Sequence, residues 1–163
     1  MDNGASRPNS KIKENMTRMF VVALLVAAVC LQSSTAAAKE SIKIGVLLPM
    51  SGNVSAFGQM EWMGIKTAHH MMGKILGREV ELVLEDTKSE QIEATRAVER
   101  LIEQHHVVGI IGGTISGSAL AAGSIAEKNG IPLISPSATN LMVTQNKKYV
   151  FRACFDDAFQ SQA

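Results

Sequence analysis

Short apolar runs recur along the chain and alternate with longer stretches in which apolar positions follow a helical period. The first run, residues 42–48 (IKIGVLL), is rich in β-branched residues and is closed by Pro49, Ser51 and Gly52, as a buried strand often is. Similar runs follow further along the chain. We therefore predict five strands, at residues 42–48, 80–84, 107–111, 131–134 and 149–152.

Three of the intervals between these runs have the pattern of helices. Residues 58–72 place a methionine-rich stripe on one face and end at Gly73. A second helix follows Thr87 and Glu90, whose spacing is that of a capping box. Its buried face is predicted to contain Ala94, Val98, Leu101 and Ile102. The third helix, at residues 118–128, consists mainly of small residues.

The alternation of strands and helices with short loops predicts an α/β fold. We expect a doubly wound parallel sheet with helices on both faces and right-handed crossovers. This fold class supports many unrelated functions, so the function has to be inferred from the residues of a site.

The N-terminus has the three parts of a secretory signal peptide. A basic stretch at residues 11–18 precedes an uncharged apolar run at residues 19–31, and small residues ending in Ala-x-Ala follow. The run is shorter than the roughly 20 residues that a membrane-spanning helix needs. We predict that residues 1–38 form the signal peptide, to which 1–15 add nothing, and that cleavage follows Ala38. The mature chain is then expected in the periplasm.

Composition narrows the classes of function. Acidic and basic residues are interspersed and the net charge is +1, whereas nucleic-acid binders concentrate Lys and Arg on one face; we therefore predict no nucleic-acid partner. The two cysteines are Cys30 and Cys154, and the first lies in the predicted signal peptide. The fold must therefore hold without an internal disulfide. Lipidation at Cys30 is disfavoured because the bulky Val29 precedes it.

Three loops rich in hydroxyl groups follow strands at their carboxyl ends, where open parallel sheets bind ligands. They are residues 51–58, 112–118 and 135–140. The second leads into a helix N-terminus, whose free N–H groups could hold a carboxylate together with the hydroxyl of Ser116 or Ser118. In the third loop, Thr139 could both donate and accept. Alternatively, either serine caps the helix and Thr139 lies in a turn.

Motifs for catalysis are missing from the sequence. The spacing around Ser116 differs from the Gly-x-Ser-x-Gly elbow of hydrolases, and neither Gly-x-Gly-x-x-Gly nor Gly-Lys-Ser/Thr occurs. The adjacent pairs His69-His70 and His105-His106 would diverge by about 100° on a helix, which disfavours a shared metal site. We therefore predict that the protein is not an enzyme and that it has no metal site and no cofactor.

Four stretches of the sequence together resemble one known family. They are IKIGVLLPMSGNVSAFG at 42–58, GIIGGTISGS at 109–118, GIPLISPSATN at 130–140 and FRACFDDAFQSQA at 151–163. In combination they resemble the type I periplasmic solute-binding proteins of the leucine/isoleucine/valine-binding family. The resemblance implies two α/β lobes that close around an amino acid, which is then handed to a membrane-embedded ABC permease.

The resemblance also implies a set of ligand-binding residues. Ser116 would bind the ligand carboxylate through its hydroxyl and backbone N–H, and Thr139 would contact both the carboxylate and the ammonium. The Ser137 carbonyl would accept from the ammonium, and Ala138 belongs to the same loop. Phe57 would take the place of an aromatic residue that lies over the ligand side chain.

A division of the chain follows from the same resemblance. Residues 39–148 correspond to the first lobe, and residues 149–163 begin the crossover to a second lobe that this sequence does not contain. The missing part should supply polar or acidic groups for the ammonium, much of the side-chain pocket and strands that return to finish the first lobe. We therefore expect an N-terminal fragment that binds its ligand weakly or not at all by itself.

Two alternatives keep the fold and change the function. The ligand could be an amide, urea or an aromatic acid, because much of the pocket lies outside this sequence. The lobe could also belong to a sensory protein in which the same fold is fused to a signalling domain. The leading hypothesis is a periplasmic receptor for branched-chain or related amino acids.

Overall fold

The computed structural model describes residues 14–16, 18, 19, 21 and 40–162. The predicted signal peptide and its cleavage after Ala38 therefore fall almost wholly outside the described residues. Within the described ranges, no helix is both long and apolar enough to cross a membrane. The strands belong to the unit that spans residues 39–163.

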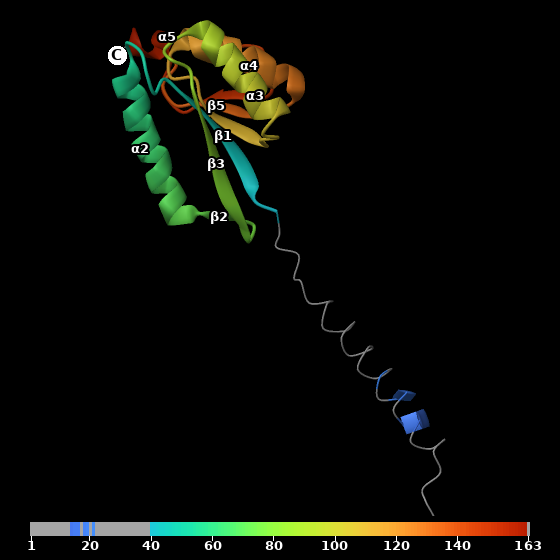
Figure 1. Ribbon diagram of the computed structural model, residues 1–163. Helices are drawn as coiled ribbons and strands as arrows, with labels where there is room; N and C mark the ends of the chain where they lie inside the picture. Colours follow the sequence, from blue (N-terminus) through green and yellow to red (C-terminus); the bar gives the residue numbers. More distant parts are fainter. Residues whose placement is uncertain (1–13, 17, 20, 22–39, 163) are drawn as a thin grey trace, which may run out of the picture. The chain divides into compact units, whose positions relative to one another are not determined.

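Strands and helices alternate along this unit, as the sequence predicts (Figure 1). The strands are β1 (Ile42–Leu48), β2 (Lys74–Ile75), β3 (Arg78–Asp86), β4 (Gly109–Gly112), β5 (Leu133–Ser135) and β6 (Val150–Arg152). The helices are α2 (Ser55–Met72), α3 (Gln91–Glu103), α4 (Ser116–Asn129) and α5 (Asp157–Gln160), with a 3₁₀ turn at Leu141–Val143. The sheet order is β2-β3-β1-β4-β5-β6, and the pairings are parallel except that of β2 with β3. The predicted parallel α/β sheet is confirmed.

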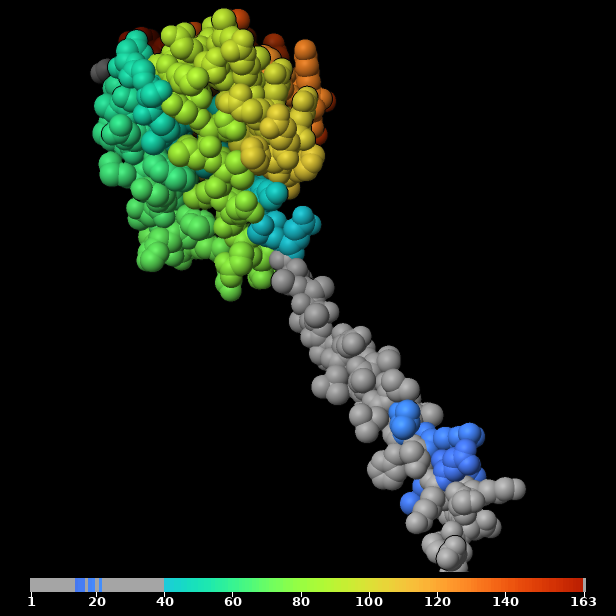
Figure 2. Space-filling model, viewed as in Figure 1, coloured from blue at the N-terminus to red at the C-terminus, as the bar shows by residue number. Residues whose placement is uncertain are grey.

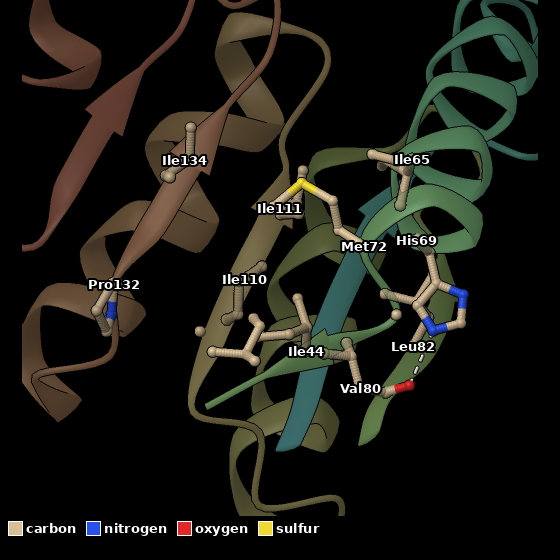
Figure 3. Close-up of a pocket in the computed structure, with 14 residues that line it drawn as sticks. Ile44, Ile65, His69, Met72, Val80, Leu82, Ile110, Ile111, Pro132 and Ile134 are labelled. Atoms are coloured by element: carbon tan, nitrogen blue, oxygen red, sulfur yellow. Dashed lines mark hydrogen bonds between the residues drawn. The ribbon is translucent and has the colours of Figure 1, made fainter. Parts of the chain in front are cut away.

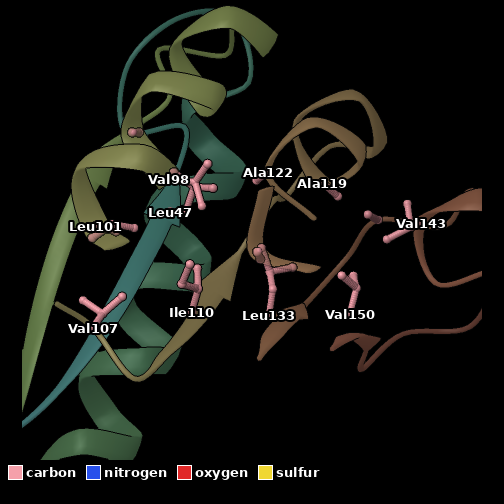
Figure 4. Close-up of a cluster of buried hydrophobic side chains, with 13 residues drawn as sticks. Leu47, Val98, Leu101, Val107, Ile110, Ala119, Ala122, Leu133, Val143 and Val150 are labelled. Atoms are coloured by element: carbon pink, nitrogen blue, oxygen red, sulfur yellow. The ribbon is translucent and has the colours of Figure 1, made fainter. Parts of the chain in front are cut away.

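The main core lies between the sheet and helices α3 and α4 (Figure 4). Leu47 of the central strand β1 belongs to one buried cluster with Val98 and Leu101 of α3 and Ala119 and Ala122 of α4, and all five side chains are fully buried. Burial of each leucine stabilises the fold by about 1.5–3 kcal/mol. The alanines of α4 leave room for this helix to pack closely against both α3 and the sheet.

The opposite face of the sheet is covered by α2 alone among the described helices, and α2 forms one flank of this unit (Figures 1 and 2). On this face the cross-strand register pairs Ile111 of β4 with Ile134 of β5, and Ile134 with Phe151 of β6. We call these three residues the apolar row. Ile134 and Phe151 are 44% and 49% exposed, so the half of the sheet beyond α2 presents apolar side chains to solvent.

Several boundaries differ from the sequence prediction. Helix α2 begins at Ser55 and helix α4 at Ser116, each a few residues earlier than predicted. Strand β2 was not predicted, because two residues are too few to carry a periodic pattern.

The predicted capping box of Thr87 and Glu90 is wrong. The Thr87 side chain is 1% exposed and its hydroxyl has no hydrogen-bond partner, while Glu90 occupies the N-cap position without a side-chain cap. Lys88 and Ser89 between them have φ values of +52° and +64°. This left-handed turn delays the start of α3 and directs Thr87 into the interior, away from the helix end.

Asp86 joins the end of β3 to the loop that follows β1. One carboxylate oxygen accepts from the N–H groups of Met50, Ser51 and Lys88, and the other accepts from the Ser51 hydroxyl at 2.6 Å. Partial burial alone would raise the pKa of Asp86, but these hydrogen bonds outweigh it and hold the pKa below its ordinary value of 3.8. The carboxylate therefore fixes the loop that leads into α2.

We expect Asp86→Asn to lower the free energy of unfolding by about 1 kcal/mol at neutral pH, after allowance for solvent screening, because the amide cannot accept all of these hydrogen bonds. The folded-state pKa lies below the unfolded one. The advantage of the wild type is therefore present above about pH 4 and is lost as the pH falls through the folded-state pKa. Urea denaturation between pH 2 and pH 7, with the exposed carboxylate variant Asp157→Asn as control, measures the difference. A difference that persists unchanged at low pH would contradict this role.

Candidate functional site

The loops that follow β4 and β5 meet at one edge of the sheet, because these strands are parallel neighbours. Ser135 joins them from within. Its hydroxyl donates to the Gly113 carbonyl at 2.8 Å and accepts from the Ala138 N–H at 3.1 Å, and its side chain is fully buried. The predicted second and third loops are therefore held side by side.

A pair of glycines turns the chain from β4 into α4. Gly112 and Gly113 have φ values of +150° and +78°, a region that residues with a side chain seldom enter. A Cβ atom on Gly112 would lie 2.1 Å from the Leu47 carbonyl oxygen, which accepts from the Gly113 N–H at 2.9 Å. The start of α4 is thereby brought close to the tip of β1.

The N-terminus of α4 carries one of the predicted serines. Ser116 is the first residue of the helix, after Ile115 at the N-cap position, and its hydroxyl accepts from the Asn140 N–H at 3.3 Å. Ser118 is 1% exposed and its hydroxyl is enclosed without a partner. Of the two serines, Ser116 is therefore the one that stands at the helix mouth, and neither caps the helix. The N–H groups of the first turn have no acceptors within the helix, which favours an anion there.

Thr139 lies next to Ser116, because Asn140, the partner of the Ser116 hydroxyl, directly follows it in the chain. The Thr139 carbonyl accepts from the Asp157 N–H and from the Arg152 guanidinium, both at 3.0 Å. The structure thus brings Ser116 and Thr139 together at adjacent strand tips, as predicted for loops that follow neighbouring parallel strands.

Arg152 organises the same loop from β6 and was not foreseen. Its guanidinium also donates to the carbonyls of Asn140 and Leu141 and to the Thr144 hydroxyl, at 2.8–3.3 Å. No sequence motif signals this role, because the partners lie 8 to 14 residues before the arginine in an irregular loop. The charged guanidinium of Arg152 therefore stabilises the loop that follows β5.

Glu61 of α2 is the second residue that sequence reasoning missed. Its carboxylate accepts from the Ser137 hydroxyl at 2.5 Å and from the Thr114 hydroxyl at 2.7 Å, so one side chain bridges both loops. Phe57 lies four residues earlier on the same face of α2 and is 57% exposed. Ala138 is 1% exposed within the core and offers little surface to a ligand.

An apolar hollow lies elsewhere, on the sheet face beside α2 (Figure 3). It has a volume of about 330 Å³ and an apolar lining that includes Ile65 and Met72 of α2 and Ile111 and Ile134 of the apolar row. His69 closes one side through a 2.9 Å hydrogen bond between its Nε2 atom and the Val80 carbonyl. Its lining lacks the hydroxyls and the helix N-terminus that mark the strand tips, so we assign the candidate site to the tips. Among the described residues, no group of three potential metal ligands is found.

The family model described as periplasmic binding protein matches residues 41–163. The chain belongs to the periplasmic binding protein family. An amino acid binding protein from Pseudomonas aeruginosa is 30% identical over 150 residues, which cover 90% of this chain and 40% of that relative.

Solved structures of periplasmic binding proteins match the same unit. The leucine-binding protein LivK from Thermotoga maritima has a TM-score of 0.72 and 50% identity, over 73% of this chain and 34% of its own. A solute-binding protein of an ABC transporter from Rhodopseudomonas palustris, solved with 3,4-dihydroxybenzoic acid, has a TM-score of 0.68 and 26% identity. That match covers 71% of this chain and 32% of its own. This periplasmic binding protein chain therefore spans well under half of these relatives and corresponds to one lobe of their type I fold.

The glycine turn before α4 makes a prediction about stability. Gly112→Ala should lower the free energy of unfolding by more than about 2 kcal/mol, because its Cβ would overlap the Leu47 carbonyl in a strained backbone conformation. Gly64→Ala is the matched control, since a Cβ at this position within α2 meets nothing within 4 Å. It should stabilise the protein by about 0.5–1 kcal/mol through helix propensity. Urea denaturation of both variants is the measurement, and a Gly112→Ala protein as stable as wild type would refute the tight turn.

Proposed function

We propose that this chain forms the first lobe of a periplasmic receptor for an ABC importer, and that its ligand is a branched-chain or related amino acid. The observation that carries the proposal is the contact between the Ser116 hydroxyl, on the first residue of α4, and the backbone beside Thr139. These groups can hold the charged head of a small zwitterion at the strand tips.

The N-terminus of α4 is suited to bind a carboxylate. The N-terminus of a helix carries about half of a positive elementary charge, and its unpartnered N–H groups point toward a bound anion. The guanidinium of Arg152 is engaged by the carbonyls of residues 139–141, so the proposed carboxylate contacts come from the helix N–H groups and the Ser116 hydroxyl. Neutral dipoles and a hydroxyl are then sufficient to bind the carboxylate.

An aromatic carboxylic acid is the second candidate ligand. The relative from Rhodopseudomonas palustris was solved with 3,4-dihydroxybenzoic acid, whereas the Thermotoga maritima relative is a leucine-binding protein. Both ligands have a carboxylate, and the α4 mouth suits either. The amino acid additionally presents an ammonium, for which the Thr139 hydroxyl and the Ser137 carbonyl are the proposed acceptors.

The remainder of the site is proposed to come from a second lobe, with a membrane-embedded permease as the transport partner. The relatives are two to three times longer than their matched segments, which leaves ample chain for such a lobe. The apolar row supports a further element: we propose that a later segment of the full-length protein packs on it and completes the first lobe. Burial of the exposed side chains of Ile134 and Phe151 under that segment would stabilise the folded protein.

In the full-length protein, Ser116→Ala and Thr139→Ala should each weaken leucine binding by about tenfold or more, since each removes a polar contact within a closed site. Ser124→Ala on the same helix is the control, because its exposed hydroxyl donates to the Leu120 carbonyl within α4. Isothermal titration calorimetry gives the affinities. Full affinity in both site variants would remove these residues from the site.

The same calorimetry discriminates between the two ligand classes. Wild-type protein should bind leucine and release heat, while 3,4-dihydroxybenzoic acid should bind far more weakly. The reverse order of affinities would favour the aromatic acid, and binding of neither would reject both candidates.

The apolar row supplies a separate stability test of the proposed later segment. In the full-length protein, Ile134→Glu should cost at least about 2 kcal/mol more than Ile92→Glu, because a covered row would bury the new carboxylate. Ile92 on α3 is the control, with 67% of its surface exposed. Equal losses in urea denaturation would show that nothing packs on the row.

A further inference from the structure

We propose that Glu61 is a positioning residue, which sets the spacing of the two ligand-binding loops without touching the ligand. This inference rests on the proposed function of the strand tips. Glu61 projects from α2, and each of its carboxylate oxygens accepts from a hydroxyl of a different loop: Thr114 after β4 and Ser137 after β5.

The chemistry of this bridge makes it directional. A carboxylate accepts and does not donate, so Thr114 and Ser137 must both act as donors toward it. Hydrogen bonds to an ionised acceptor are about twice as strong as neutral ones. The Ser137 hydroxyl also lies 2.8 Å from the Thr114 carbonyl, and because it has a single hydrogen these two acceptors compete for it.

The position of Glu61 explains why the bridge matters to the site. Thr114 is two residues before Ser116, and Ser137 is two residues before Thr139. The direct bond between the binding segments, from the Asn140 N–H to the Ser116 hydroxyl, is 3.3 Å long and therefore weak. The shorter bonds to Glu61, at 2.5 and 2.7 Å, therefore act together with the buried Ser135 hydroxyl in setting the spacing of the two loops.

Helix α2 joins the first predicted loop, residues 51–58, to the same arrangement. Phe57 stands one helical turn before Glu61 on the same face, so the carboxylate that fixes the loops also fixes the distance from Phe57 to them. A site held in advance in its binding geometry loses less free energy when the ligand is ordered in it.

Glu61→Ala in the full-length protein should accelerate amide hydrogen exchange in residues 113–118 and 136–140 and weaken leucine binding by about tenfold or more. Glu61→Gln keeps the shape and one acceptor oxygen, and it should restore the affinity to within about threefold of wild type. Ser137→Ala should cost little further affinity in the Glu61→Ala background, because residues that act through one another are not additive.

Glu127→Ala is the matched control. Its carboxylate also bridges two donors, the N–H groups of Lys148 and Tyr149, but it does so at the opposite end of α4. This variant should lower the melting temperature while leaving the exchange of both loops and the leucine affinity unchanged. Equal loss of affinity in Glu127→Ala and Glu61→Ala would reduce Glu61 to a general stabilising residue and overturn the proposal.

Two further outcomes separate this inference from the proposed function. Unchanged exchange of both loops in Glu61→Ala overturns the bridge, whatever the affinity. Accelerated exchange together with no leucine binding by the wild type supports the bridge and rejects leucine as the ligand.

If Glu61→Gln loses as much affinity as Glu61→Ala while its loops exchange normally, Glu61 contacts the ligand directly and the positioning role is wrong.

Discussion

The parallel pairing of β4 with β5 is the constraint on which the site depends. The register sets Ile110 opposite Leu133 and Ile111 opposite Ile134, so both strands end at the same edge of the sheet. The pairing alone therefore makes the start of α4 and the 135–140 loop neighbours, and no side-chain contact is needed for this. Because the ladder is short, however, its hydrogen bonds alone do not fix the loops beyond it, and side chains have to take over.

Three hydroxyl groups of these loops serve that structural task. Ser135, Ser137 and Thr114 bond to carbonyls or to Glu61 inside the fold. Ser116 and Thr139 differ, because the first stands at a helix mouth and the second belongs to a loop that Arg152 holds through its carbonyls. A loop rich in hydroxyls is therefore weak evidence for binding by itself, and the helix terminus separates the binding candidates from the structural ones.

Strands and helices could be predicted from the sequence because each depends on the pattern of apolar and polar residues within its own segment. The apolar run of β1 gave its bounds, and the small residues around Ser116 gave the turn and helix. The predicted capping box at Thr87 is wrong because the spacing of Thr87 and Glu90 does not reveal the left-handed turn at Lys88 and Ser89. Glu61 could not be found, since its partners Thr114 and Ser137 lie 53 and 76 residues further along the chain. Such contacts follow from the tertiary fold, and helix periodicity does not contain them.

The two faces of the sheet differ in how completely helices cover them. Toward α3 and α4 the core is closed by leucines and alanines, which give a rigid base for the strand tips. Toward α2 the sheet is half open, and the same helix presents Phe57 beside the tips. On the proposed function, the α4 mouth binds a carboxylate and so does not distinguish leucine from an aromatic acid. Selectivity must then arise where the rest of the ligand lies, between Phe57 and groups beyond this lobe, and it depends on how firmly Glu61 holds α2 against the tips.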